Sequence, residues 1–433
     1  MRSFVWDGEI TAQRVRELIP RAAVSIDSVA PSVQKLIAEV QAEGVAALAR
    51  HAQEFDGVVP NSFRVPISAI KASEADLPDG LREAITESIA RVRKVSQATL
   101  PRAVSLEVST GGAVETRFVP VDSVGLYVPG GKAVYPSSTV MNVVPAQVAG
   151  VPRIAVSSPA QKDNDGLPSN AVLATCSLLG IDEVYSIGGA SAIAALAFGV
   201  VEIGMEPVRM VTGPGNIYVA AAKRQLRSQI AIDSEAGPTE ILIIADESAN
   251  PAFVAADLIS QAEHDENAAS VLLTNSQSLI DEVLAELERQ GSKTANRDRV
   301  ASALGGNQSA LVLVESIDLA IEIANEYATE HLEIQTADPV AVSKRITNAG
   351  AIFLGNHTPV SLGDYLAGSN HVLPTGEQAK FASGLSVMSF LRSQQVVNYS
   401  EAALKEVASK LEVFAEAEGL PAHSEAVQIR FED

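Results

Sequence analysis

The stretch Val124-Gly125-Leu126-Tyr127-Val128-Pro129-Gly130-Gly131, followed by Tyr135-Pro136-Ser137-Ser138-Thr139, decides the fold of this chain. Its first half is typical of a buried strand that runs into a glycine turn, and its second half opens a helix predicted to reach Val148. The first backbone amides of such a helix point into the preceding loop. Strand, glycine turn and helix therefore form a layout that can bind an anion.

The same pattern recurs along the chain. Short strands that read into loops follow at 153–157, 183–187 and 208–212, and a second series of alternating strands and helices runs from Glu240 to Gly355. Such alternation indicates mostly parallel sheets covered by helices on both faces, with ligands at the strand ends. We predict an α/β fold of two Rossmann-like parallel α/β domains with a cleft between them, plus small helical N- and C-terminal segments.

The predicted boundaries divide the chain into four parts. Residues 1–25 form an N-terminal helical segment, 26–124 and 238–380 together form one α/β domain, 125–237 form the second, and 381–433 form a helical tail. The loop 236–240 joins the two domains and is a predicted hinge. The tail is too small to build a core alone, so we expect it to pack on the main body or on a second subunit.

Composition excludes several classes of protein. The 433 residues are 47% hydrophobic and 20% charged, which is ordinary for a folded protein, and the net charge of −21 would repel nucleic acid. The one cysteine, Cys176, excludes an internal disulfide. No apolar run approaches the ~18 residues of a membrane span, and no signal pattern opens the chain. We expect a cytoplasmic protein without a membrane or nucleic-acid partner.

Four of the six histidines, unlike His51 and His357, lie in segments dense in carboxylates, glycine or asparagine: His264, His331, His371 and His423. Gln261 and His264 are three residues apart at the end of a predicted helix, so both could reach one cation. Alternatively, they are a capping glutamine and a surface histidine. With Asp364, from a long glycine-rich loop, and His423, they offer two nitrogens and two oxygens, which suits Zn²⁺, Mn²⁺ or Co²⁺.

Glu330 and His331 are candidates for acid–base chemistry. We expect them at the end of an amphipathic helix, where neighbouring side chains point about 100° apart and could serve different parts of one substrate. An imidazole suits proton transfer near neutral pH, and a carboxylate can activate a water molecule. An exposed Glu-His pair at a helix end without a catalytic role is the alternative.

Taken together, the motifs resemble the histidinol dehydrogenase family over nearly the whole chain from about residue 30. The motifs are Gly125-Leu-Tyr-Val-Pro-Gly-Gly, Tyr135-Pro-Ser-Ser-Thr-Val-Met-Asn, Gly213-Pro-Gly-Asn, Ala236-Gly-Pro-Thr-Glu, Gln261-Ala-Glu-His-Asp, Glu330-His-Leu-Glu, Gly363-Asp-Tyr, Gly368-Ser-Asn-His-Val-Leu-Pro-Thr and Pro421-Ala-His. The resemblance implies oxidation of L-histidinol through L-histidinal to L-histidine, the last step of histidine biosynthesis, with two NAD⁺ reduced in turn.

The resemblance also implies a role for each motif residue. One zinc per subunit would be held by Gln261, His264, Asp364 and His423, His331 would be the base, and Glu330 would activate the water that hydrates the aldehyde. The implied substrate contacts are these metal ligands and His331 together with Thr239, His371 and Glu418, and the implied NAD contacts are Tyr127, Ser191 and Asn216. The family's active form is a homodimer with shared sites, so His423 and Glu418 of the tail would complete the other subunit's site.

One residue departs from the family pattern. The second glycine loop reads Gly188-Gly-Ala-Ser191, where the family usually has glutamine at the last position. Serine is too short to make the same cofactor contact, so we expect NAD⁺ to bind more weakly or through a water.

Three other functions stay open at this stage. A paralogous zinc- and NAD-dependent dehydrogenase for another small polar alcohol would use the same metal ligands. A zinc hydrolase would use Glu330 as its base, which the two α/β units and paired glycine loops disfavour. A catalytically silent metal-binding protein would not need the Glu330-His331 pair.

Overall fold

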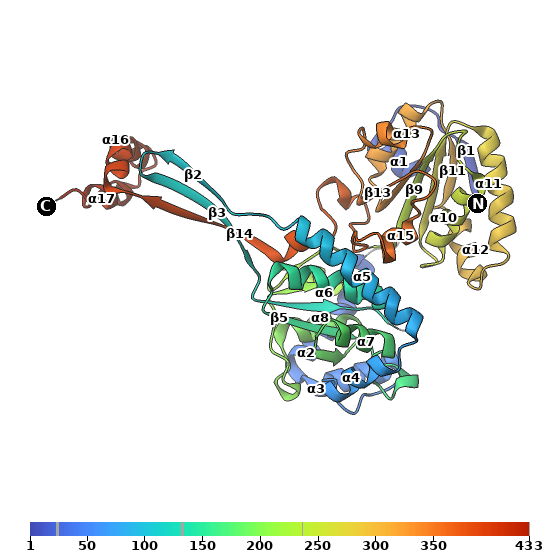
Figure 1. The fold of residues 1–433 in the computed structure, drawn as a ribbon, viewed down its shortest axis with the longest axis horizontal. Helices are drawn as coiled ribbons and strands as arrows, with labels where there is room; N and C mark the ends of the chain where they lie inside the picture. The colour runs from blue at the N-terminus through green and yellow to red at the C-terminus, as the bar shows by residue number, and fades with distance from the viewer. Residues whose placement is uncertain (23–25, 131–133, 236, 433) are drawn as a thin grey trace.

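Two parallel sheets form the body of the molecule, and an antiparallel ribbon carries the C-terminal helices away from it (Figure 1). The computed structural model describes residues 1–22, 26–130, 134–235 and 237–432. Gly131 of the first predicted glycine turn and Ala236 of the predicted hinge lie outside the described residues. The predicted α/β class with parallel sheets is confirmed.

The first sheet has six strands, all parallel, in the order β1 (Arg2–Val5), β11 (Ala310–Leu313), β10 (Ala269–Thr274), β9 (Glu240–Ala245), β12 (His331–Gln335) and β13 (Ala351–Leu354). Alternate residues of β9 face opposite cores: Ile241 and Ile243 pack toward α10 to α12, while Leu242 and Ile244 pack toward α1 and α13. The helices of this part are α1 (Ala12–Leu18), α10 (Pro251–Ala262), α11 (Gln277–Gly291), α12 (Arg297–Gly305), α13 (Ile317–Tyr327), α14 (Pro339–Ser343) and α15 (Val360–Tyr365).

The second sheet has five strands, again parallel, in the order β6 (Val184–Ser186), β5 (Arg153–Ser158), β4 (Ser123–Tyr127), β7 (Met210–Thr212) and β8 (Ala231–Ile232). The chain reverses direction across the sheet between β4 and β7, and ligands of open α/β sheets bind at such a switch point. The helices here are α2 (Ile26–Glu43), α3 (Val45–His51), α4 (Ile67–Ala75), α5 (Asp79–Ala98), α6 (Pro136–Ala149), α7 (Asn170–Leu178), α8 (Gly189–Phe198) and α9 (Ile217–Leu226).

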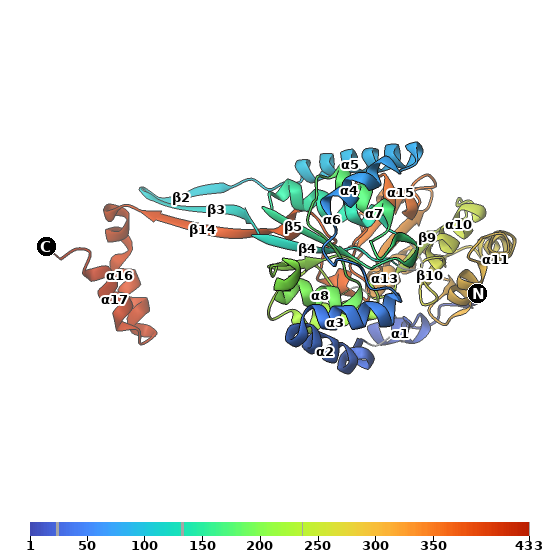
Figure 2. The same cartoon turned by 90° about the horizontal axis from the view of Figure 1, so that it is seen from below.

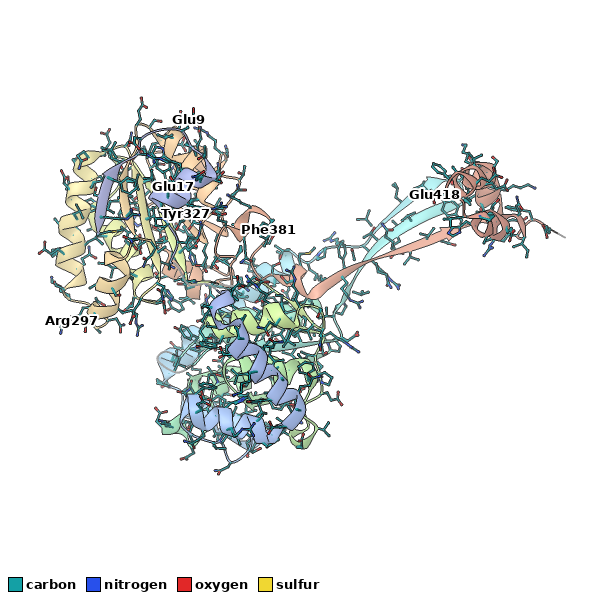
Figure 3. The ribbon with its side chains drawn as sticks, turned by 180° about the vertical axis from the view of Figure 1, so that it is seen from behind. Glu9, Glu17, Arg297, Tyr327, Phe381 and Glu418 are labelled. Atoms are coloured by element: carbon teal, nitrogen blue, oxygen red, sulfur yellow. The ribbon has the colours of Figure 1, made fainter. Side chains whose placement is uncertain are left out.

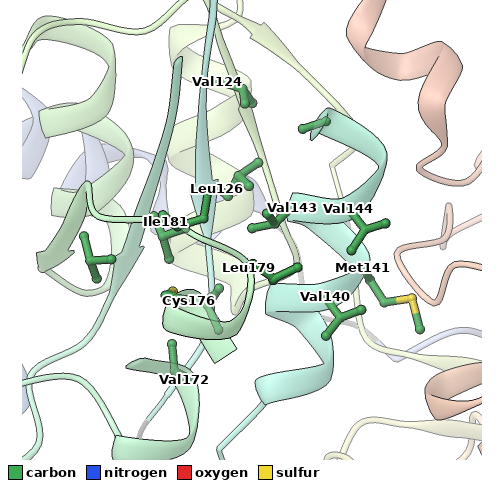
Figure 4. Packing of buried hydrophobic residues seen from close by; sticks show 14 of the residues in the cluster. Val124, Leu126, Val140, Met141, Val143, Val144, Val172, Cys176, Leu179 and Ile181 are labelled. Carbon is green, nitrogen blue, oxygen red and sulfur yellow. The ribbon is translucent and has the colours of Figure 1, made fainter. Parts of the chain in front are cut away.

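Figure 4 shows one face of this second sheet, where Val124 and Leu126 of β4 meet α6 and α7. Cys176 is fully buried in this cluster, and burial raises the pKa of its thiol to about 12. A thiol that stays protonated packs as a small apolar group. The cysteine therefore has a packing role, as the sequence indicated.

Two parts of the body differ from the expected division of the chain. Residues 1–25, expected to be a helical segment, begin with the strand β1 at the edge of the first sheet. Helices α2 to α5, in the range 26–98, pack on the second sheet instead of the first, because the apolar face of α2 meets alanine-rich α8 and α9 and α5 covers α6.

The C-terminal arm also differs from the expected helical tail. It contains strand β14 (Leu391–Tyr399), which pairs antiparallel with β3 (Gly112–Pro120), itself paired with β2 (Val104–Ser109). Helices α16 (Glu401–Ala417) and α17 (Pro421–Gln428) lie at the far end of this ribbon in both views (Figures 1 and 2). Among the described residues, no helix has the length and apolar character needed to cross a membrane.

Candidate active site

Glu330 and His331 lie at the amino end of strand β12 and are both buried. The expectation that they end a helix is wrong: α13 stops at Tyr327, and Ala328 takes a left-handed conformation with φ of 51°. From His331 onward, polar and apolar residues alternate with the period of a strand, which pairs with both β9 and β13. The strand fixes the pair more rigidly than a fraying helix end would.

Glu330 is held from the neighbouring strand β9. Its Oε2 accepts hydrogen bonds from Thr239 Oγ1 at 2.5 Å and from the Glu240 backbone N–H at 2.9 Å. Burial raises the pKa of Glu330 well above its ordinary value, although these hydrogen bonds favour the ionised form. A carboxyl group with a raised pKa is a better general base once ionised, so Glu330 suits the activation of water.

His331 has one ring nitrogen ready to accept a proton. Its Nδ1 lies 3.0 Å from the Glu240 carbonyl oxygen, which can only accept, so Nδ1 carries the hydrogen. The lone pair is then on Nε2, which is buried without a hydrogen-bond partner among the residues that the structure describes. Burial lowers the pKa of His331, which keeps the ring neutral at pH 7. A neutral ring with a buried, free lone pair has the properties required of a general base.

Gln261 presents a second unpartnered atom. It is the penultimate residue of α10 and is 1% exposed; its amide nitrogen donates to Thr239 Oγ1. Its carbonyl oxygen Oε1 is buried and has no hydrogen-bond partner in the described part of the chain. Leaving a buried carbonyl oxygen unpaired costs about 1–3 kcal/mol. A cation or a substrate donor at this oxygen would remove that cost.

Asp364 lies near three of the predicted site histidines, His264, His331 and His371. It is on the short helix α15, where the sequence predicted only a loop. Desolvation by the surrounding protein lowers the pKa of all three histidines, and the Asp364 carboxylate opposes this shift in each. His264 keeps solvent access just beyond the end of α10. Neutral imidazoles beside a carboxylate form a donor set that suits a divalent metal ion.

His371 ties this cluster to the second sheet. Its Nδ1 lies 3.0 Å from the Asp364 backbone carbonyl, and its Nε2 lies 3.1 Å from Ser138 Oγ. Ser138 is in the first turn of α6, so this hydrogen bond joins the helix that follows β4 to the histidine cluster. Asn370 adds a hydrogen bond from its amide to the Met141 carbonyl at 2.7 Å.

Within one chain, His423 and Glu418 are not brought to the other predicted residues. Both are exposed on the arm, and Figure 3 shows Glu418 at its far end, away from the body residue Tyr327. In the described part of the chain, no three His, Cys, Asp or Glu side chains are grouped to hold a metal ion. Gln261, His264 and Asp364 therefore lack the fourth predicted ligand in a single subunit.

The predicted cofactor residues lie together around one cavity of 640 Å³ at the switch point of the second sheet, which Tyr127, Ser191 and Asn216 all line. The Tyr127 hydroxyl accepts from the Gly189 N–H at 3.1 Å, and burial raises its pKa to about 12. Asn216 caps α9 by accepting from the N–H groups of Tyr218 and Val219. The amino ends of α8 and α9 both open here, which favours an anionic ligand.

Gly213 is required for this arrangement. Its φ is 117°, and a Cβ built there would lie 2.0 Å from the Tyr127 carbonyl oxygen. Only glycine lets the loop after β7 approach the end of β4 this closely. The glycine loops that the sequence indicated therefore shape the cavity.

Replacement of Asp56 by asparagine should stabilise the protein above pH 6 and lose this effect toward pH 4. Asp56 lines the same cavity, and burial raises its pKa from 3.8 to about 6. The folded chain then binds more protons than the unfolded chain between these values, so stability falls as pH rises through them. Thermal unfolding of the variant and the unaltered protein at pH 4, 6 and 8 measures this difference. A difference in Tm that does not change with pH would contradict it.

Sequence reasoning missed a pair of carboxyl groups, Asp257 and Glu333, that hydrogen-bond to each other beside the site. Burial raises the pKa of both, most strongly for Glu333, so Glu333 holds the shared proton. Gln335 donates to both carboxyls at 3.0 Å, and Glu333 Oε1 accepts from the Val360 N–H at 2.9 Å. The pair links the elements that carry Gln261, His331 and Asp364. Only the fold brings α10, β12 and α15 together.

Comparison with known proteins agrees with this geometry. The family model described as histidinol dehydrogenase matches residues 19–431. The histidinol dehydrogenase of Leifsonia xyli is 56% identical, over 98% of this chain and 97% of its own length, and that of Thermobifida fusca is 56% identical over 96% and 94%. The crystal structure of histidinol dehydrogenase from Elizabethkingia anophelis superposes with a TM-score of 0.93 at 33% identity, covering 100% of this chain and 98% of the other. The chain belongs to the histidinol dehydrogenase family.

Proposed function

We propose that this chain oxidises L-histidinol through L-histidinal to L-histidine, the final step of histidine biosynthesis, using NAD⁺ and one zinc ion per subunit in the cytoplasm. Membership of the histidinol dehydrogenase family supports the reaction. The observation that carries the mechanism is the buried Nε2 of His331, which has no hydrogen-bond partner among the described residues, on a ring whose Nδ1 lies 3.4 Å from Glu330 Oε2. An alcohol oxidation needs a base at the hydroxyl, and this nitrogen can supply it.

The residues present fit a zinc site that is completed by a second subunit. Gln261 Oε1, His264 and Asp364 would supply three ligands from the body, and His423 of another subunit would supply the fourth. Bound zinc would hold the amino and imidazole nitrogens of the substrate and so fix its position. Thr239, His371 and Glu418 would add substrate contacts. The chain's own contribution is to keep Gln261 in place through Thr239, which also donates to Glu330.

His331 and Glu330 would then act in turn. His331 Nε2 takes the proton of the alcohol while the Glu240 carbonyl holds the ring through Nδ1. Glu330 takes a proton from water, and the resulting hydroxide adds to the aldehyde carbonyl to give the hydrate that is oxidised next. NAD⁺ would accept one hydride in each oxidation. Both side chains are buried, which excludes bulk water from the reacting groups.

NAD⁺ would occupy the cavity at the switch point of the second sheet. The helix ends of α8 and α9 suit its pyrophosphate, and Tyr127, Ser191 and Asn216 line the space. Ser138 of α6, the helix that follows β4, contacts His371, which supports hydride transfer between a cofactor at the second sheet and a substrate at the histidine cluster.

The arm supports a homodimer with shared sites. Its β-ribbon and helices expose many large apolar side chains, and an apolar surface of this kind marks an interface between proteins. They include Val104, Leu106, Val108, Val397, Val413 and Phe414, each at least half exposed. A second copy of the chain would cover these side chains. His423 and Glu418, on the exposed end of one subunit's arm, would complete the active site of the other subunit. Two-fold exchange of such arms gives two equal active sites.

The rival functions differ from this one in what they produce. A dehydrogenase for another small polar alcohol would share the metal ligands but not the preference for histidinol, and a zinc hydrolase would form no NADH. The buried base nitrogen of His331 and the cavity at the switch point favour a dehydrogenase. Histidinol is favoured over other alcohols by the family membership.

The test is the amount of NADH formed per histidinol consumed by the purified protein. We expect two NADH per histidinol, because two oxidations follow each other in one site, and we expect a chelator of divalent metals to abolish the reaction. Zinc added back should restore it. One NADH per histidinol would contradict the four-electron reaction, and activity that survives complete metal removal would contradict the zinc site.

A further inference from the structure

Three polar side chains form a hydrogen-bonded chain that ends in the cavity of the second sheet. His51 Nδ1 lies 2.9 Å from Ser191 Oγ, and His51 Nε2 lies 2.7 Å from Glu39 Oε2. The three residues come from three different helices, α3, α8 and α2. No sequence pattern links them, because His51 lies in an unremarkable polar segment.

The direction of the hydrogen bonds follows from the chemistry of the groups. A carboxylate only accepts, so Nε2 of His51 carries a hydrogen and donates it to Glu39. In the tautomer with its hydrogen on Nε2, Nδ1 carries the lone pair and accepts the hydroxyl hydrogen of Ser191. The hydrogen bond from His51 lowers the pKa of Glu39, and Lys35 and Arg50 lie 3.7 Å and 3.9 Å from its carboxylate oxygens. Glu39 therefore stays ionised and remains the acceptor for Nε2.

The oxygen of Ser191 is left with its lone pairs for the cavity. Ser191 and His51 are each 4% exposed and both line the cavity, so a ligand there meets a hydroxyl whose hydrogen is already committed. Such an oxygen accepts a hydrogen bond from a ligand donor and gives nothing to a ligand acceptor.

The backbone beside His51 is unusual in a way that also serves the cavity. Directly after α3 the chain forms a π-helix, Ala52–Asp56, which places Phe55 and Asp56 along the same cavity wall. π-Helical turns are rare and occur frequently at functional sites. The π-helix and the hydrogen-bonded side chains of Glu39, His51 and Ser191 lie at one wall of the cavity. Both features indicate a ligand contact there, besides the contact expected at the amino ends of α8 and α9.

We propose that His51 and Glu39 position the Ser191 hydroxyl as the acceptor for a ribose hydroxyl of the bound dinucleotide. This inference rests on the proposed function, in which NAD⁺ fills the cavity. Ser191 lies in the first turn of α8, whose amino end suits the pyrophosphate, and the ribose hydroxyls that flank a pyrophosphate are donors. His51 thus compensates for the short side chain at position 191 by fixing its hydroxyl, and it is a positioning residue.

A double-mutant cycle on the zinc-loaded, full-length enzyme tests the proposal, with NAD⁺ as the titrated ligand. Ser191→Ala and His51→Phe should each raise the Kd of NAD⁺ about tenfold, the loss of roughly one hydrogen bond. The double variant should bind no more weakly than Ser191→Ala alone, because His51 acts only through Ser191. The Kd of histidinol should not change in any of them.

A second pair of variants keeps the buried core intact. Glu39 is partly exposed, and Glu39→Ala should raise the Kd of NAD⁺ because His51 loses its partner. Glu43→Ala is the matched control: Glu43 lies one turn further along α2 and pairs with Arg50, so its loss should leave NAD⁺ binding unchanged. Thermal unfolding without ligand shows whether each variant folds.

The outcomes separate this inference from the proposed function. If Asn216→Ala and Ser191→Ala weaken NAD⁺ binding but His51→Phe and Glu39→Ala do not, the positioning role is wrong and the cofactor cavity stands. If the effects of Ser191→Ala and His51→Phe multiply in the double variant, His51 acts on its own and the positioning role is also wrong. If no variant of the cavity changes NAD⁺ binding, the cofactor lies elsewhere and both proposals fail.

Discussion

His331→Ala should lower kcat for histidinol oxidation by about 10²- to 10⁴-fold, the usual contribution of a positioned general base. The Nε2 atom of His331 has no hydrogen-bond partner within the described ranges of the chain, so its removal takes away the proton acceptor without breaking a described hydrogen bond at that nitrogen. The hydrogen bond between His331 Nδ1 and the Glu240 carbonyl is lost as well. Because Glu240 is not a proposed metal ligand, this loss should leave the metal site in place. The expected signature is a lower kcat with unchanged Kd values for NAD⁺ and zinc.

The pH dependence distinguishes loss of the base from loss of structure. In the unaltered enzyme, activity should fall as His331 becomes protonated at low pH, below the usual range because burial lowers the pKa of His331. In His331→Ala, this fall of activity at low pH should be absent, and added imidazole should partly restore activity. A variant that retains the same acid limb at lower kcat would show that another group is the base.

Glu330→Gln is the matched comparison. Glu330 precedes His331 in the chain, and glutamine has nearly the same shape as glutamate. It should spare the oxidation of histidinol more than the oxidation of histidinal, because only the second oxidation requires activated water. The amide can still meet the Thr239 and Glu240 groups that hold the carboxyl. Equal losses in both half-reactions would contradict the division of roles between Glu330 and His331.

The sequence singled out Glu330 and His331 as candidates but predicted the wrong local structure for them. Glu330 and His331 were expected on a helix because the apolar spacing of α13 continues almost to them. The left-handed Ala328 ends the helix, and the buried alternation of residues 331–335 favours a strand once β9 and β13 lie on either side. Pairing with strands about 90 residues earlier and 20 later cannot be deduced from a local pattern.

Other features could not be predicted because they depend on packing between distant segments. Helices α2 to α5 carry no motif, and only their apolar faces against α6, α8 and α9 assign them to the second sheet. The contact between His51 and Ser191 spans 140 residues, and the hydrogen bond that joins Glu333 to Val360 spans 27. By contrast, Gln261, the penultimate residue of α10, needed only helix periodicity, whereas His264 lies two residues beyond the end of that helix.

Mixing two inactive variants should restore activity if the arms are exchanged between subunits. His331→Ala disables the body and His423→Ala disables the arm, so each homodimer has two defective sites. In a mixed dimer, one site receives both defects and the other receives none. Random pairing makes half of the dimers mixed, so one site in four is intact and about a quarter of the full activity should return. Histidine formed after the two variants are unfolded and refolded together is the measurement.

The control mixture combines His331→Ala with His264→Ala, both of which lie on the body. Each site of a mixed dimer then carries one defect, so activity should stay at the level of the separate variants. Failure of the His331→Ala and His423→Ala mixture, with mixed dimers demonstrated by differently tagged subunits, would mean that His423 serves the site of its own chain. The arm would then have to fold back onto its own body. The ribbon, in which β14 pairs with β3 from Leu391 to Tyr399, instead extends away from the body, so exchange is the arrangement that keeps the observed position of the arm (Figure 1).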